Sequence, residues 1–289
     1  MIDYYGQPAL KRPHWEWNVV LYLFLGGVMG GSAILGAIAR EPELRRTAKT
    51  TAFMLSAVCP AILISHLGRP ERFYKMLRVV KLKSPMSLGV WGLMKFSGLS
   101  GISLLLERSG RRSAFFDFAN AIIGAFICGY TGVLLSATAN PLWGKGKVHI
   151  PAMCVASGIA GACALNAALL GARGTDLTAR QLERFEMAAS AAELALLLHF
   201  RNTGGDYVRP MFEGDRGQQL RNVTVVTGIL APLALNILSI VSSKRQHSFM
   251  RTLLSTALTL AGGYMLRHTL IESGKAAADD PQLGLHQPA

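Results

Sequence analysis

Long apolar runs alternate with short clusters of charged residues along the whole chain. A helix that crosses a bilayer needs about 20 consecutive, mostly apolar residues. Runs of about that length occur eight times, at 17–39, 50–67, 87–106, 115–137, 151–170, 183–199, 223–241 and 249–270. Most are apolar on every side, whereas helices of a soluble protein carry a polar side that recurs with a period of 3.6. The pattern therefore predicts an all-α integral membrane protein with about eight transmembrane helices, arranged as two four-helix bundles.

The same pattern indicates a single membrane domain over residues 1–289, without a separate soluble domain. Residues 1–16 are polar and aromatic and do not have the form of a cleavable signal peptide, so we expect the first apolar run to act as the insertion signal. A first half at 17–143 is followed by a second helical half at 144–271. The polar residues 272–289 are expected to form a flexible tail.

Composition agrees with a membrane location, because 51% of the residues are apolar and only 16% are charged. The 30 Lys and Arg residues outnumber the 17 acidic residues, which leaves a net charge of +13. Basic residues are densest on four short loops, which the positive-inside rule places in the cytoplasm, with the N-terminus and the long loops outside. The excess charge indicates topology signals, contact with the lipid bilayer or a docking surface. A nucleic-acid partner is not expected, because the basic residues form no stripe on a soluble module.

Cysteine and histidine limit the cofactors that the chain could hold. All four cysteines fall inside predicted spans without a CxxC pair, which favours packing over metal or cluster ligation, so no metal or iron–sulfur cluster is expected in this chain. His66, His199 and His268 lie at span ends on one side, so a haem held by two histidines stays open as an alternative to interfacial histidines. The first span contains two overlapping GxxxG pairs, Gly26/Gly30 and Gly27/Gly31, which favour close helix packing and leave a slot for a flat ligand as the alternative.

Three short tracts at span ends carry the clearest signal. His66-Leu67-Gly68-Arg69-Pro70-Glu71-Arg72-Phe73 follows the second span, where glycine and proline stop a helix. Ser84-Pro85-Met86-Ser87-Leu88-Gly89-Val90-Trp91-Gly92 opens the third span. The fourth span closes with the tract that begins Tyr130-Thr131-Gly132-Val133-Leu134-Leu135 and ends Asn140-Pro141-Leu142-Trp143.

Together with the glycine-rich first helix, these tracts resemble the polysulfide reductase membrane-subunit family, also called NrfD-like. That family has an LGRPxRF turn after helix two, an SPMSxGxW entry to helix three and a YTGxLLxxxxxPLW exit from helix four. All three stand here in the expected order and spacing. The resemblance covers roughly residues 14–143, and the second half matches only as further spanning helices.

The resemblance implies a quinone-reactive anchor of a multi-subunit oxidoreductase in a bacterial or archaeal inner membrane. Such an anchor exchanges electrons between menaquinone or ubiquinone and a ferredoxin-like iron–sulfur subunit, with uptake or release of protons. A catalytic subunit, often one that holds a molybdenum cofactor, completes the complex. The isolated chain need not be an enzyme, and no haem is implied.

The placement of polar residues favours a quinone site independently of that resemblance. The start of the first span, the end of the second, the start of the third and the end of the fourth share one membrane face. The expected quinone-binding residues there are Asn18, Tyr22, His66, Arg69, Trp91 and Tyr130. Tyrosine and asparagine can hydrogen-bond the quinone oxygens, His66 could exchange a proton, and Arg69 could stabilise a developing anionic oxygen. The family often has aspartate where His66 stands, which leaves the role of that histidine open.

Three ionisable residues within spans suggest a proton path, since such residues are costly in a membrane and usually face an interior route or a partner. They are Lys95, Glu186 and Glu193, and the two glutamates lie seven residues apart on nearly one helix face. A structural Lys95–Glu193 pair, or hydration of these groups near the span ends, is an equal alternative. For the whole chain, a haem-bearing cytochrome b-like subunit and a transporter are the competing functions. A transporter would show broken helices at matching positions of two halves, whereas the proline and glycine motifs here lie at span ends.

Overall fold

The computed structural model describes residues 10, 12–13, 15–65, 69–78, 80–81, 83–241, 249–280 and 283. These residues form helices joined by short connections, and none of them lies in a β-strand. The long helices are α1 (Trp17–Ile38), α2 (Pro42–Ser65), α4 (Pro85–Arg108), α5 (Ala114–Ser136), α7 (His149–Gly171), α8 (Asp176–Thr203) and α12 (Phe249–Asp279). A further long helix is continuous through α10 (Gly214–Gln219), the π-helical segment η4 (Leu220–Leu230) and α11 (Ala231–Val241). Short pieces lie between them: η2 (Pro70–Arg72), α3 (Tyr74–Leu77), α6 (Pro141–Lys145), η3 (Gly205–Val208) and α9 (Arg209–Phe212).

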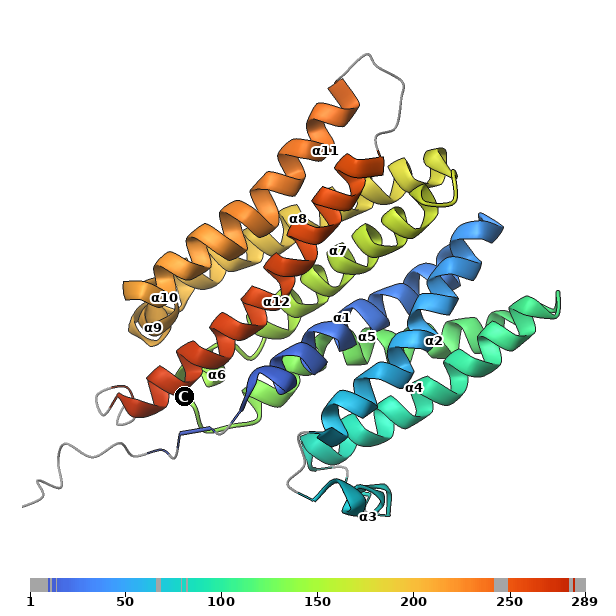
Figure 1. Cartoon of the computed structure of the whole chain (residues 1–289). Helices are drawn as coiled ribbons and strands as arrows, with labels where there is room; N and C mark the ends of the chain where they lie inside the picture. Colours follow the sequence, from blue (N-terminus) through green and yellow to red (C-terminus); the bar gives the residue numbers. More distant parts are fainter. Residues whose placement is uncertain are drawn as a thin grey trace, which may run out of the picture.

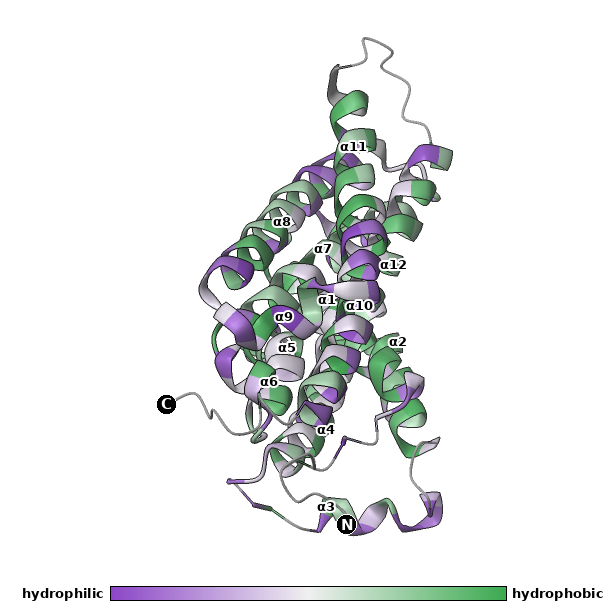
Figure 2. Cartoon of the chain, turned by 90° about the vertical axis from the view of Figure 1, so that its left-hand side faces the viewer, coloured by the Kyte–Doolittle hydropathy of each residue, from purple (hydrophilic) through white to green (hydrophobic). Residues whose placement is uncertain are grey.

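Each of the eight predicted spans corresponds to one of these long helices, so the all-α membrane fold is confirmed. Six of the helices in the described part of the chain are long and apolar enough to cross a membrane. The other two, α8 and α12, have the length but carry more charge. Their charged residues within the predicted spans include Glu186 and Arg267, which are buried. Figure 2 shows hydrophobic residues along much of α2 and α11.

The long helices form two groups of four (Figure 1). The first group contains α1, α2, α4 and α5, and the second contains α7, α8, α10–α11 and α12. Helix α1 joins the groups, because it packs on α2 and α5 on one side and on α7 and α12 on the other. Its glycines allow this: Gly30 lies against the carbonyl of Gly124 on α5, and Gly31 lies against Gly158 on α7. The packing interpretation of the two GxxxG pairs is therefore confirmed.

Helix α2 begins at Pro42, earlier than the predicted start at residue 50, because its first turns bury charge. Lys49 Nζ lies 2.6 Å from Asp117 Oδ1 on α5 and 3.0 Å from Glu107 Oε2 on α4. Arg45 Nε lies 2.9 Å from the same Glu107 carboxylate, and Ser103 donates to Asp117 at 2.6 Å. Basic residues that the sequence places in a loop thus pair with acids on two neighbouring helices.

The predicted flexible tail from residue 272 begins too early, since α12 continues to Asp279. The third sequence tract explains the difference. Asn140 Nδ2 donates to the carbonyl of Gly274 at 2.7 Å, and Trp143 Nε1 donates to that of Leu270 at 2.9 Å. Trp15 stacks on Trp143 with 5.4 Å between ring centroids. The end of α12 is therefore held against the turn after the fourth span.

Candidate functional site

Two of the predicted site residues, Tyr22 on α1 and Tyr130 on α5, lie together in the core of the first group. Both are buried and belong to one apolar cluster that also contains Cys59 and Leu93. The two tyrosines are close enough to interact electrostatically. The Tyr130 hydroxyl donates to the carbonyl of Pro85 at 3.1 Å. This arrangement places two phenolic hydroxyls in an apolar interior near the start of α1, the start of α4 and the later turns of α5.

Gly89 explains how Tyr130 fits there. A Cβ atom at this position of α4 would overlap the ring and the hydroxyl of Tyr130. Gly89 belongs to the tract that opens the third span, and Tyr130 belongs to the tract that closes the fourth. The two tracts therefore meet in space, and the glycine makes the room that the tyrosine occupies.

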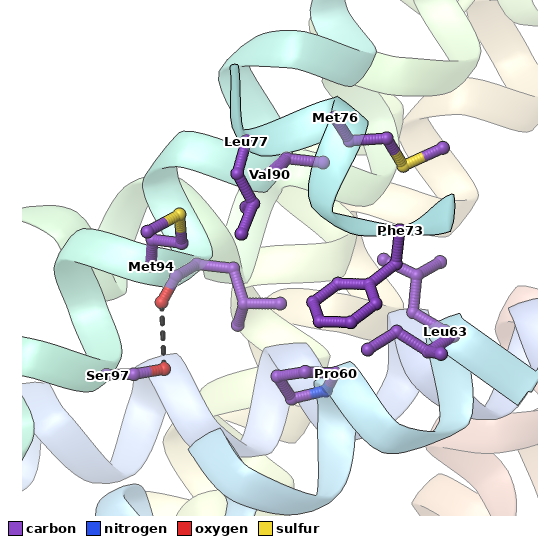
Figure 3. Close-up of a pocket in the computed structure, with 10 residues that line it drawn as sticks. Pro60, Leu63, Phe73, Met76, Leu77, Val90, Met94 and Ser97 are labelled. Atoms are coloured by element: carbon purple, nitrogen blue, oxygen red, sulfur yellow. Dashed lines mark hydrogen bonds between the residues drawn. The ribbon is translucent and has the colours of Figure 1, made fainter. Parts of the chain in front are cut away.

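An apolar pocket of about 340 Å³ lies between α2, α3 and α4 (Figure 3). Its lining residues are Pro60, Leu63, Ile64, Phe73, Met76, Leu77, Val90, Leu93, Met94 and Ser97. Phe73, from the tract after the second span, points between α2 and the short helix α3 in Figure 3. Leu93 lines the pocket and also belongs to the cluster that holds the two tyrosines. The pocket is thus next to the buried tyrosines, on the α2 and α4 side.

A proline inside α2 shapes the polar contact in this pocket. Pro60 has no N–H, so the carbonyl of Ser56, four residues earlier, lacks its helical donor. The hydroxyl of Ser97 on α4 lies 3.3 Å from that carbonyl and 2.9 Å from the carbonyl of Leu93. The serine therefore satisfies part of the backbone that the proline leaves open, and it is the polar side chain in the pocket wall.

Other predicted quinone-site residues lie elsewhere. Asn18 is half-buried one turn before Tyr22, and its Oδ1 accepts the N–H of Val19 at 2.9 Å. Trp91 is half-buried and lies one turn before the exposed Lys95, so it shares the outward side of α4. Arg69 is exposed at the start of η2. His66 lies outside the described residues.

The three residues predicted for a proton path are also separated. Lys95 is exposed on α4, which packs on α2 and α5, whereas Glu186 and Glu193 are buried on α8, which packs on α7. Lys95 and Glu193 form no ion pair, so the alternative of a Lys95–Glu193 pair is wrong. The sequence shows that Lys95 and Glu193 both lie within spans, but it does not show that their helices, α4 and α8, pack on different neighbouring helices.

Sequence reasoning missed Arg267, whose side chain is completely buried on α12. Its Nη1 donates to Ser157 Oγ and to the carbonyl of Gly263, both at 2.9 Å, and Nη2 donates to the carbonyl of Cys154 at 3.0 Å. The guanidinium carbon lies 5.6 Å from the centre of the Phe24 ring. A buried arginine of this kind needs these partners, because desolvation of an unpaired charge is costly. The signal in the sequence was a basic residue inside the last apolar run.

Glu193 is a buried acid on α8 that is linked to Arg267 through the hydroxyl of Ser157. Ser157 hydrogen-bonds to Glu193 and accepts from Arg267, so one hydroxyl connects the two charges. Glu193 Oε1 is buried and has no hydrogen-bond partner among the described residues. The carboxylate is therefore held on one oxygen and left without a described partner on the other.

Further acids continue the series along α8. Glu186 accepts from Thr259 at 2.6 Å and from Asn236 at 3.2 Å. Glu183, nearer the start of α8, accepts from Thr252 at 2.7 Å and lies 3.8 Å from Arg251. Since α8 starts at the membrane face opposite the start of α1, these acids lead toward that face.

At its other end the series ends at the residue next to Tyr130 in the sequence. Thr131 follows Tyr130 directly, hydrogen-bonds to the Cys154 side chain and lies 3.5 Å from the carbonyl of Leu23. The backbone carbonyl of Cys154 accepts from Arg267. We call the series Thr131, Cys154, Arg267, Ser157, Glu193, Ser190, Glu186 and Glu183 the polar chain. Ser190, buried on α8, lies between Glu193 and Glu186.

The chain as a whole matches one family model. Residues 8–278 match the family described as polysulphide reductase, NrfD. The chain belongs to the NrfD polysulphide reductase family. A curated relative, the Protein NrfD homolog of Haemophilus influenzae, is 25% identical over 307 residues, covering 90% of this chain and 94% of that protein.

Membership in the NrfD family and the long apolar helices together make the chain a multi-pass membrane subunit. The three tracts have different tasks in this NrfD subunit. Gly89 and Tyr130 build the buried site, and Phe73 covers the pocket. Asn140 and Trp143 instead hold the end of α12 in place, although the sequence placed Asn140 among the polar residues of the same face.

Proposed function

We propose that this NrfD-family chain is the quinone-reactive membrane subunit of an oxidoreductase complex. The observation that carries the proposal is the buried Tyr130, which stands beside Tyr22 and is accommodated by Gly89. Oxidation of a quinol releases two electrons and two protons, and quinone reduction takes up the same number. A phenolic hydroxyl in an apolar interior can hydrogen-bond a quinone oxygen and position the ring for that exchange.

The apolar pocket between α2 and α4 supports the same proposal. A quinone carries a hydrocarbon tail that needs an apolar slot open to the bilayer, and this pocket of about 340 Å³ is lined almost entirely by apolar side chains. Leu93 in its wall lies one turn after Gly89, which packs on Tyr130, so a tail in the pocket would lead its headgroup toward Tyr22 and Tyr130. Asn18, one turn from Tyr22, is a further hydrogen-bonding group at the entrance of α1.

The electrons need a partner, because this chain is proposed to hold no cluster or haem of its own. We expect a ferredoxin-like iron–sulfur subunit to dock on the face that carries the start of α1 and the end of α5, with a molybdenum-cofactor or other catalytic subunit beyond it. Menaquinone or ubiquinone is the substrate, and the inner membrane of a bacterium or archaeon is the expected location. Arg69, exposed at this face, is placed to contact the partner or lipid headgroups.

Replacing one hydroxyl tests the site. Tyr130→Phe removes the donor and keeps the ring, so we expect quinol oxidation by the purified complex to fall about tenfold, as for loss of one hydrogen bond worth about 1.4 kcal/mol. Tyr264→Phe removes a hydroxyl from the second group of helices and serves as the matched control. Steady-state assays with a soluble naphthoquinol measure both variants.

One outcome of this assay would contradict the proposed quinone site. Wild-type turnover in Tyr130→Phe, with the complex intact on a sizing column, would mean that the tyrosine pair is not the quinone site. Purification of the chain in mild detergent without any iron–sulfur subunit would remove the proposed electron partner.

We further propose that protons of the quinone reaction move along the polar chain. Glu193 and Glu186 are the residues on it that can accept and release a proton, and Arg267 supplies a fixed positive charge beside Glu193. Thr131 and Arg267 connect this route to the tyrosines, and Glu183 leads to the opposite face. Lys95 is left out, because it is exposed on α4.

Glu193→Gln tests this path, since glutamine keeps the size but cannot carry a proton. We expect proton release by complex-containing vesicles to slow by about 100-fold, the usual effect of removing a proton-transfer group. Lys95→Gln is the control, because it also removes a charge from a span but lies outside the polar chain. Normal proton release in Glu193→Gln would exclude Glu193 from the path while leaving the quinone site intact.

A further inference from the structure

A second cavity, of about 350 Å³, lies where α6, the start of α7 and the end of α8 come together. Its lining residues are Gly144, Lys145, Lys147, Val148, His149, Phe200, Thr203 and Gly204. They belong to the second group of helices and to the turn before it, away from the tyrosine pair and the polar chain. The proposed quinone chemistry does not use them.

The charged side chains that line this cavity are basic. Two lysines, Lys145 and Lys147, stand in its wall, and none of the described lining residues is acidic. Neither lysine forms an ion pair within the described part of the chain, whereas nearby Asp206 and Glu213 are paired with Arg209. The cavity therefore offers uncompensated positive charge to an anion.

One side chain at the start of α7 favours the same kind of ligand. His149 Nδ1 is buried without a hydrogen-bond partner in the part of the chain that the structure describes, and its ring lies 5.1 Å from that of His199. A buried polar atom without a partner indicates a missing ligand or water.

The surroundings of the cavity are apolar and outward-facing. Val148 in its wall is 76% exposed. An exposed aliphatic side chain beside lysines at the end of membrane-crossing helices matches an amphipathic ligand, with its charge at the lysines and its chains along the helices.

We propose that this cavity binds the phosphate headgroup of an anionic phospholipid. Lys145 and Lys147 hold the phosphate, His149 lies beside it, and the exposed Val148 contacts the acyl chains. An inorganic phosphate ion shares the headgroup chemistry but would gain nothing from the exposed valine. An acidic segment of a partner protein would compete for the same lysines.

The test titrates delipidated protein in detergent with phosphatidylglycerol, with phosphatidylethanolamine and with inorganic phosphate, and counts bound molecules by native mass spectrometry. We expect one tight phosphatidylglycerol site in the wild type. The double variant Lys145→Gln/Lys147→Gln should bind about 30-fold more weakly, since each lysine near a lipid surface contributes about 1 kcal/mol. The control Lys81→Gln/Lys83→Gln removes two exposed lysines at the same spacing on another loop and should bind as the wild type does.

Three results would overturn the proposal. Equal binding of phosphatidylglycerol by the cavity variant and the control would place the lipid elsewhere. Displacement of the lipid by low millimolar inorganic phosphate would assign the cavity to a free anion. Loss of a co-purifying partner subunit in the cavity variant, with lipid binding unchanged, would assign the lysines to a protein interface.

Discussion

At the scale of single residues, the absence of a side chain at Gly89 sets the position of the Tyr130 hydroxyl. A methyl group there would meet the phenol, and overpacking of this kind typically costs about 1–3 kcal/mol. We therefore predict that Gly89→Ala displaces Tyr130 and weakens binding of a quinone analogue, measured by titration of the purified subunit.

Gly98, nine residues later on α4, provides the control, because no atom lies within 4 Å of a Cβ at that position. Gly98→Ala should leave quinone binding unchanged and raise the free energy of unfolding by up to about 1 kcal/mol through helix propensity. If the two variants bind the analogue equally well, Gly89 has no special part in the site.

At the scale of elements, α2 and α4 meet at the pocket beside a helical hydrogen bond that Pro60 removes from α2. Pro60→Ala restores the N–H that the carbonyl of Ser56 lacks and competes with Ser97 for it. We predict that the variant folds but binds a long-tailed quinone severalfold more weakly than the wild type, with little change for a tail-less analogue, because the altered wall is that of the apolar pocket.

Pro232→Ala is the matched control, since Pro232 also lies within a continuous long helix but belongs to the second group. Binding measured for both quinones in both variants separates a pocket effect from a general effect of removing proline. Equal loss for the tail-less analogue in Pro60→Ala would contradict a tail-binding role of the pocket.

At the scale of the whole molecule, α1 is the element on which the two groups of helices meet. Tyr22 faces the first group, Gly31 packs on α7, and a Cβ at Gly27 would meet the guanidinium of Arg267. The tyrosine pair and the polar chain are therefore adjacent across one glycine-rich helix. Such close approach is possible only because small residues let backbones come together in a membrane, where packing and hydrogen bonds drive helix association. This adjacency supports the proposed coupling of quinone chemistry to proton movement.

The sequence by itself determined the number and order of the long helices, because apolar runs of about 20 residues have few alternatives in a bilayer. It also indicated Tyr22 and Tyr130, since span ends on one face can be assigned from the order of the helices. Only the tertiary structure decided which ionisable residues point inward. Lys95 and Arg267 both stand in apolar runs, yet one is exposed and the other is completely buried. Their direction depends on which helices, distant in sequence, pack against α4 and α12, and local hydropathy carries no information about those neighbours.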